Sequence, residues 1–158
     1  MGKWTVEDIE DLTNKTFVIT GANSGIGYEA AKIIASKGGQ VILACRSVEK
    51  AEQAVASIEE SCANAQVTYT LLDLADLESV KRCAEKLNND LERLDVLINN
   101  AGVMALPYTL TKDNFEMQIG TNHLGHFAFT ALLFPTLAKT PLGRIVTVAS
   151  NAHKAGRI

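Results

Sequence analysis

Three glycines, Gly21, Gly25 and Gly27, stand at a spacing that suits the phosphates of a nucleotide. The stretch before them, Thr16-Phe17-Val18-Ile19, is rich in residues that favour strands. Apolar residues at helical spacing follow them, at Ile26, Ala30, Ile33 and Ile34. Gly21 permits a tight turn, Gly25 lets the backbone approach a ligand, and Gly27 lets the helix pack close to the strand. The first N–H groups of that helix would bind a pyrophosphate, so the run predicts a dinucleotide site; the alternative is an ordinary strand-to-helix turn.

Basic residues follow a second predicted strand at Val41–Cys45. An acidic residue at its end would bind the ribose 2′-OH of NAD, whereas an arginine nearby accommodates the 2′-phosphate of NADP. Here Cys45 takes the place of the acid, Arg46 follows it, and Lys50 stands one helical turn further on. The pattern favours NADP over NAD; the alternative is a solvated basic pair at a helix start.

Two further polar motifs follow predicted strands. Asp73-Leu74 comes after a strand at 67–71, and Asn99-Asn100-Ala101-Gly102 comes after a strand at 95–98. Ligands of open parallel sheets bind at the carboxyl ends of the strands. Taken singly, Asp73 could be a helix cap and the asparagines a turn.

A long helix predicted over about 113–136 carries Asn122, His123 and His126. Asparagine is unfavourable inside a helix, so Asn122 is either functional or a partly exposed polar residue. The two histidines lack a third ligand at a sensible spacing, so they are interpreted as surface or packing residues and no metal site is predicted. Ser150 ends a predicted strand at 144–149 and is either catalytic or a turn residue.

Strands and helices therefore alternate along the whole chain, including helices expected around 51–58 and 77–91. This order predicts an α/β fold with one doubly wound parallel sheet and helices on both faces. The 158 residues form one predicted domain, 1–158, with 47% hydrophobic and 21% charged residues.

Charge and cysteine content narrow the classes of function. A formal charge of −3 and a pI near 5.6 give no electrostatic case for nucleic-acid or membrane-surface binding. The longest apolar run, 124–138, is too short to cross a bilayer, and no signal peptide is predicted. The three cysteines are odd in number and widely spaced, which favours a reducing, cytoplasmic setting over a disulfide framework.

The spacing of the glycine run, Thr-Gly-x-x-x-Gly-x-Gly, resembles the motif of the short-chain dehydrogenase/reductase family. The Asn-Asn-Ala-Gly motif resembles that of the same family. Asn-His-Leu-Gly-His-Phe at 122–127 resembles its retinol-dehydrogenase-like branch, as do Ala-His and Gly-Arg-Ile after Ser150. The resemblance runs from Thr16 to Ile158. It implies a Rossmann-type sheet of strand order 3-2-1-4-5 and NADP(H)-dependent hydride transfer between nicotinamide and an alcohol or carbonyl, retinoid-like or otherwise lipophilic.

The resemblance also assigns roles to single residues. It places Asp73 and Leu74 beside the adenine, Asn99, Ala101 and Gly102 along the path of the cofactor, and Asn122 and Ser150 in the active site, where Ser150 hydrogen-bonds the substrate oxygen. The full predicted cofactor set is Gly21, Asn23, Ser24, Gly25, Ile26, Gly27, Arg46, Lys50, Asp73, Leu74, Asn99, Ala101 and Gly102.

One element of the family pattern is missing after Ser150. The family uses a proton-donating tyrosine followed four residues later by lysine, and the matches here, Tyr28/Lys32 and Tyr108/Lys112, precede the serine. We therefore expect the N-terminal part of a longer dehydrogenase, with a sheet that is incomplete on its C-terminal side and prone to self-association. The alternative is a catalytically silent nucleotide-binding or interaction module; a methyltransferase-type fold is disfavoured by the glycine spacing.

Overall fold

Strands and helices alternate along the chain in the computed structural model, which describes residues 4–151 and 154. The strands are β1 (Thr16–Thr20), β2 (Gln40–Cys45), β3 (Gln66–Leu71), β4 (Val96–Asn99) and β5 (Arg144–Thr147). The helices are α1 (Gly25–Ser36), α2 (Val48–Ser61), α3 (Leu77–Asp90), α4 (Met117–Ile119) and α5 (His126–Lys139), with a 3₁₀ turn η1 (Val6–Asp8) and a π-helical turn η2 (Gly120–Gly125).

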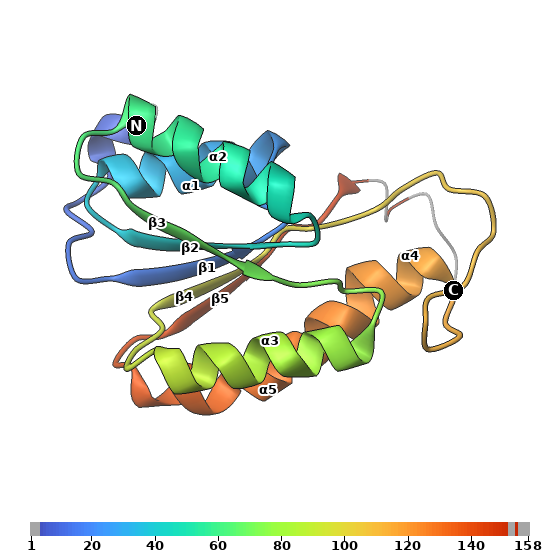
Figure 1. Cartoon of the computed structure of the whole chain (residues 1–158). Coiled ribbons are helices and arrows are strands. Elements are labelled where there is room, and N and C mark those ends of the chain that lie inside the picture. Colours follow the sequence, from blue (N-terminus) through green and yellow to red (C-terminus); the bar gives the residue numbers. More distant parts are fainter. Residues whose placement is uncertain (1–3, 152–153, 155–158) are drawn as a thin grey trace.

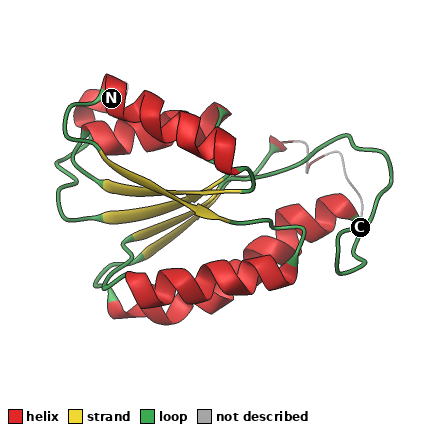
Figure 2. Cartoon of the chain, in the orientation of Figure 1, coloured by secondary structure: helices red, strands yellow, loops and turns green. Residues whose placement is uncertain are grey.

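The five strands form one parallel sheet in the order β3-β2-β1-β4-β5. Helices α1 and α2 cover one face of the sheet, and α3 and α5 cover the other (Figures 1 and 2). This arrangement confirms the predicted α/β fold and the predicted strand order.

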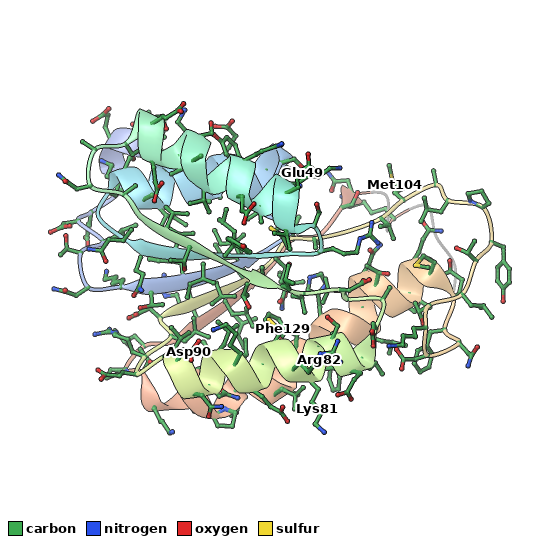
Figure 3. All side chains as sticks on the ribbon, in the orientation of Figure 1. Glu49, Lys81, Arg82, Asp90, Met104 and Phe129 are labelled. Atoms are coloured by element: carbon green, nitrogen blue, oxygen red, sulfur yellow. The ribbon has the colours of Figure 1, made fainter. Side chains whose placement is uncertain are left out.

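In β1 and β2, neighbouring residues belong to different cores, because successive side chains point to opposite faces of a sheet. Val18 and Ile42 belong to the core under α3 and α5, which also contains the fully buried Phe129 of α5 (Figure 3). Ile19 and Leu43 belong to the core under α1 and α2. Burial on both faces explains why the middle of β1, Phe17-Val18-Ile19, is continuously apolar rather than alternating.

The helix expected from about residue 113 begins four residues later, so its predicted start is wrong. Thr111 N–H donates to Phe115 O over 2.8 Å, Asn114 has a φ of 64°, and Leu110 forms an isolated antiparallel bridge with Glu116. These contacts fold residues 110–116 into a tight turn. Glu116 then caps the helix, with its carboxylate accepting from Gln118 N–H and Ile119 N–H.

The helical segment from residue 117 to residue 139 contains the π-helical turn η2 and continues through Pro135. Gly125 ends η2 against the loop after β3, where a Cβ would lie 2.4 Å from Leu74 O. Only a residue without a side chain fits there, so the segment that carries Asn122 lies directly against Leu74.

Candidate cofactor site

A cavity of about 350 Å³ lies at the carboxyl ends of the strands. Its walls come from the loops after β1, β2, β3 and β4 and from η2. The lining residues are Gly21, Asn23, Ser24, Ala44, Cys45, Arg46, Leu72, Asp73, Leu74, Asn100, Ala101, Gly102, Val103 and Thr121. Residues from five stretches of the sequence therefore meet in one cavity, at the edge of the sheet where the sequence placed a ligand.

The loop after β1 packs tightly against the loop after β4. Gly21 has a φ of 64°, and a Cβ on it would lie 2.9 Å from the Cα of Ala101. A Cβ on Gly27 would lie 2.4 Å from the amide nitrogen of Asn100. Both glycines are therefore required by the close approach of the loop after β4, to the loop after β1 at Gly21 and to the first turn of α1 at Gly27.

Gly25 is different, because a Cβ on it would meet nothing within 4 Å although its φ is 59°. It begins α1, and the preceding Ser24 makes no side-chain capping bond to the helix. Ile26 is 74% exposed. The first N–H groups of a helix without a cap, beside open space, fit a pyrophosphate group.

Arg46 lies at the border of this cavity, exposed, and makes no hydrogen bond or ion pair with any residue that the structure describes. The neighbouring Cys45 is buried; burial raises the pKa of its thiol, although the N–H groups of Ala22 and Asn23 oppose this. Lys50 does not line this cavity. It borders a separate notch of about 420 Å³ beside Ser24 and Tyr28.

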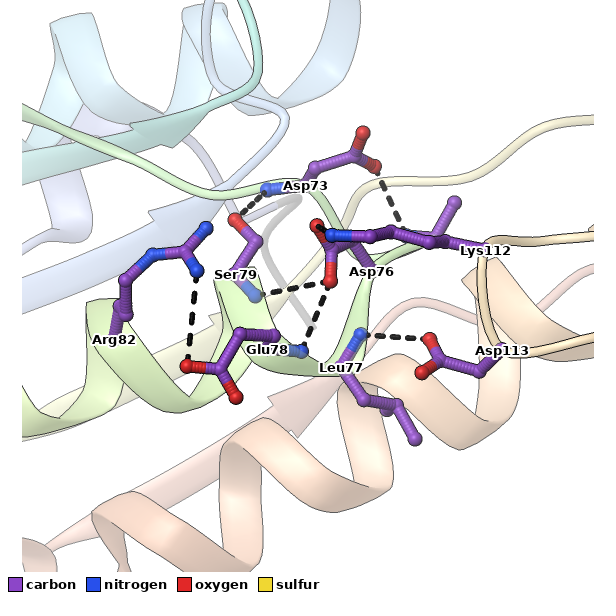
Figure 4. A network of polar contacts seen from close by, with 9 residues as sticks. Asp73, Asp76, Leu77, Glu78, Ser79, Arg82, Lys112 and Asp113 are labelled. Atoms are coloured by element: carbon purple, nitrogen blue, oxygen red, sulfur yellow. Dashed lines mark hydrogen bonds and ion pairs between the residues drawn. The ribbon is translucent and has the colours of Figure 1, made fainter.

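The loop after β3 is held by polar contacts at the start of α3 (Figure 4). Asp73 N–H donates to Ser79 Oγ over 3.0 Å, and Asp73 Oδ1 accepts from Ala75 N–H over 2.9 Å. Asp76 caps α3 and accepts from Lys112 Nζ over 2.7 Å, a bond that lowers the pKa of Asp76. Asp73 thus faces the cavity from a fixed turn, while the capping is done by Asp76.

Thr20, the last residue of β1, joins β1 to the loop after β4. Its Oγ1 accepts hydrogen bonds from Asn100 N–H and Ala101 N–H, both over 2.9 Å, and its carbonyl accepts from the Asn100 amide over 2.9 Å. Of the two asparagines, Asn100 lines the cavity. The Asn99 side chain turns away and donates to Thr130 Oγ1, and its buried Oδ1 has no partner among the described residues.

The side chain of Asn122 is bonded to the loop after β4. Its Oδ1 accepts from Val103 N–H and its Nδ2 donates to Val103 O, each over 2.8 Å. Asn122 also lines a small second cavity of about 240 Å³ with Asn99 and His126. Ser150 is exposed, three residues beyond the end of β5.

The predicted cofactor residues thus fall into two groups. The cavity collects Gly21, Asn23, Ser24, Arg46, Asp73, Leu74, Ala101 and Gly102, whereas Gly25, Ile26, Gly27, Lys50 and Asn99 lie outside its lining. Sequence reasoning did not assign Asn100, Val103 or Thr121, although Asn100 belongs to the Asn-Asn-Ala-Gly motif and Thr121 precedes Asn122. The Ala-His and Gly-Arg-Ile motifs after Ser150, at 152–153 and 156–158, contributed to the resemblance but lie outside the residues that the structure describes.

Two further properties concern the described residues only. No cluster of three or more His, Cys, Asp or Glu side chains in that part of the chain could hold a metal ion. None of the helices described there has the length and apolarity needed to cross a bilayer.

Comparison with known proteins identifies the family to which this chain belongs. The model of the family described as short chain dehydrogenase matches residues 15–158. Retinol dehydrogenase 11 of Homo sapiens is 50% identical over 93% of the chain, and the match covers 46% of that protein. The chain thus spans about half the length of this curated relative.

Solved structures agree with the family model. The crystal structure of an uncharacterised protein from Mycobacterium paratuberculosis has a TM-score of 0.85 and 50% identity, covering 98% of this chain and 53% of that one. A short chain dehydrogenase from Escherichia coli CFT073 complexed with NADPH has a TM-score of 0.80 and 29% identity, covering 94% and 63%. The chain therefore belongs to the short-chain dehydrogenase/reductase family, within which it is similar to the retinol dehydrogenases.

Proposed function

We propose that this chain binds NADP(H) and forms the cofactor-binding part of an oxidoreductase that interconverts an alcohol and a carbonyl, with a retinoid-like or other lipophilic substrate. The observation that carries the proposal is the uncapped start of α1 next to Gly25, where open space adjoins the cavity bordered by Arg46. Helix N–H groups suit the pyrophosphate, and the cation suits a further phosphate.

Arg46 is the basis for proposing NADP rather than NAD. Cys45 occupies the position at which an acid would bind the 2′-OH, and the unpaired guanidinium of Arg46 follows it at the cavity border. A related dehydrogenase from Escherichia coli is complexed with NADPH, which supports this choice.

The proposed chemistry divides between the cofactor and the chain. A bound nicotinamide would supply or accept the hydride. Asp73 and Leu74 would border the adenine, and Gly102 would leave room along the path of the cofactor. Ser150 would donate a hydrogen bond to the substrate oxygen as negative charge develops on it. Asn122 would hold the loop after β4 in place through Val103.

Reduction of a carbonyl also needs a proton for the substrate oxygen. We propose that none of the three tyrosines of this chain donates it. Tyr28 is bonded to Ser57 on the α1–α2 side, the hydroxyl of Tyr69 donates to Glu52, and Tyr108 is 79% exposed on a loop. Positioned proton transfer contributes about 10²–10⁴ in rate. We therefore expect this chain to bind NADPH but to reduce retinoid-like aldehydes negligibly, and steady NADPH oxidation that is lost in Ser150→Ala would contradict this.

The binding test compares NADPH with NADH by fluorescence titration. Loss of one charge-assisted hydrogen bond, about 1.5–3 kcal/mol, corresponds to about 10- to 150-fold in affinity. We expect a preference of that size for NADPH in the wild type and its loss in Arg46→Ala. Lys50→Ala is the matched control, because Lys50 lies outside the cavity and its loss should leave most of the preference intact. Equal affinity of the wild type for both cofactors would remove the argument for NADP.

A further inference from the structure

His126 is a buried histidine to which the proposed chemistry gives no role. It is the first residue of α5, it is only 5% exposed, and it lies between Thr20 at the end of β1 and Asn122 in η2. Its Nε2 lies 2.8 Å from Thr20 Oγ1, and its Nδ1 lies 2.9 Å from Asn122 O. Both ring nitrogens are therefore bonded to segments that border the cofactor cavity.

The partners of Thr20 determine which ring nitrogen carries the proton. A hydroxyl has two acceptor positions and one donor. Thr20 Oγ1 already accepts from Asn100 N–H and Ala101 N–H, so its own hydrogen points to His126 Nε2, which accepts it. Nδ1 then carries the proton and donates to the carbonyl of Asn122. The imidazole is neutral in this arrangement.

The bonds form one continuous chain around the site. Thr20 donates to His126, His126 donates to Asn122 O, and the side chain of Asn122 binds both backbone groups of Val103. At one end of this chain of bonds Thr20 also binds Asn100 and Ala101, and at the other end Asn122 binds Val103. Asn100, Ala101 and Val103 all line the cofactor cavity. A change at His126 therefore reaches the cavity wall at both ends of the loop after β4.

Protonation of the imidazole would break this arrangement. An added Nε2–H would face Thr20 Oγ1, whose two acceptor positions are occupied, so Thr20 would have to release Asn100 or Ala101. Besides Thr20 of β1, the residues that line the small cavity together with His126 are Asn99 of β4, Ile145 and Thr147 of β5, and Asn122, His123, Phe127 and Thr130 of its own helical segment. Among them His123 is the one other titratable side chain. Burial lowers the pKa of His126, which keeps the ring neutral at pH 7.

We propose that His126 is a positioning residue for the cofactor site: as the neutral, Nδ1-protonated imidazole it joins Thr20 to Asn122 and so fixes the loop 100–103 against the cavity. The consequence for the cofactor rests on the proposed binding of NADP(H), but the bonding arrangement does not. Acidification should release the loop through His126.

The first experiment tests the bonds without any cofactor. Nitrogen-15 NMR of the histidine-labelled chain, with signals assigned through His126→Gln and His123→Gln, should show His126 protonated at Nδ1 and unprotonated at Nε2 at pH 8. The amide shifts of Asn100 and Ala101 should titrate with the midpoint of His126. Protonation at Nε2, or amide shifts that ignore this titration, would overturn the proposal whether or not NADPH binds.

The second experiment measures the NADPH dissociation constant in the wild type, His126→Gln and His123→Gln, from pH 8 to a pH below the His126 midpoint that the NMR titration gives. The glutamine at 126 offers Thr20 an acceptor oxygen but does not titrate, so near-wild-type affinity is expected at pH 8. Below the pKa of His126 the wild type should weaken about 2- to 10-fold more than His126→Gln, the equivalent of one ordinary hydrogen bond. The cofactor 2′-phosphate titrates in all three proteins and cancels in the comparison.

The exposed His123 serves as the matched control, so His123→Gln should keep the wild-type pH profile. Identical pH profiles for the wild type and His126→Gln would overturn the positioning role. If the wild type binds no NADPH at any pH, the proposed function fails, and the NMR measurement alone decides on His126.

Discussion

Gly21 and Gly25 have nearly the same backbone conformation but different surroundings. Their φ angles are 64° and 59°, in the left-handed region that side chains disfavour. Gly21 is enclosed by Ala101, whereas Gly25 faces open space. The first glycine therefore holds two loops together, and the second leaves room beside the helix for a ligand.

A pair of alanine variants separates these two roles. Both substitutions should cost about 1–2 kcal/mol for the left-handed conformation. Gly21→Ala should lose about 1–3 kcal/mol more, because its methyl group would press against Ala101 at 2.9 Å. Urea unfolding measures the difference, and titration of each variant with NADPH measures binding.

The variants should rank differently in binding than in stability. Gly25→Ala should lose only the cost of the left-handed conformation, yet bind NADPH at least tenfold more weakly, since its methyl group occupies the open space. Equal destabilisation by both variants would contradict the close contact at Ala101, and undiminished binding by Gly25→Ala would contradict the pyrophosphate position.

At the scale of elements, Asp95 joins the starts of β1 and β4. The Asp95 carboxylate accepts from Thr16 N–H over 2.8 Å and from the guanidinium of Arg93. Burial alone would raise the pKa of Asp95, but the bonds from Arg93 and Thr16 outweigh it and the pKa lies below its usual value. A depressed carboxyl pKa stabilises the fold at neutral pH, and this contribution is lost as pH falls through the folded-state pKa.

Asp95→Asn should therefore reduce the free energy of unfolding at pH 7 by about 1–2 kcal/mol, a value discounted for the partial exposure of Arg93. The deficit should shrink below about pH 4, where the Asp95 carboxyl of the unfolded wild type takes up its proton first because its pKa is the higher of the two. Urea unfolding at pH 7 and pH 3 measures both values. Arg82→Ala is the comparison, because its pair with Glu78 is exposed and should contribute almost nothing. A deficit at pH 3 as large as at pH 7 would count against an ionised Asp95.

The parallel sheet with helices on both faces was predictable from sequence because apolar strands and amphipathic helices alternate. Its strand order was predicted through the resemblance to the short-chain dehydrogenase/reductase family. The orientation of single residues was not. Asn99 and Asn100 are neighbours on opposite faces, and which of them reaches the cavity depends on contacts with Thr20 and Thr130 from distant segments. The predicted helix start near residue 113 was also wrong, because the chain makes a backbone turn at Asn114 that helix propensity does not reveal. The proposed role of His126 could not be predicted either, because it depends on hydrogen bonds to Thr20 and Asn122, which are 106 and 4 residues away in the sequence.

At the scale of the whole molecule, β5 is an edge of the sheet in the described structure. All four of its residues are exposed, with Ile145 at 44% and Val146 at 45%. An apolar edge strand exposes unpaired N–H and C=O groups to any other chain that can add a strand. Self-association of this chain through β5 follows as a prediction.

Sedimentation velocity at rising protein concentration measures that association. The wild type should form larger species as concentration increases, and Val146→Lys should suppress them because a charged side chain on an edge strand opposes pairing. Leu142→Lys adds the same charge to an 89% exposed residue before β5 and should leave association unchanged. A wild type that stays monomeric throughout would contradict the prediction.

The hydrogen bonds of Thr20 also determine how late in synthesis and folding the cofactor site can be completed. Thr20 lies near the beginning of the chain, but its hydroxyl is bonded to residues 80, 81 and 106 positions later. During synthesis the glycine loop leaves the ribosome long before the histidine that completes its surroundings, so the nascent loop has no finished pocket. Such distant pairings are formed late and slowly in folding. NADPH should accordingly slow unfolding of the finished protein while leaving the rate of refolding unchanged.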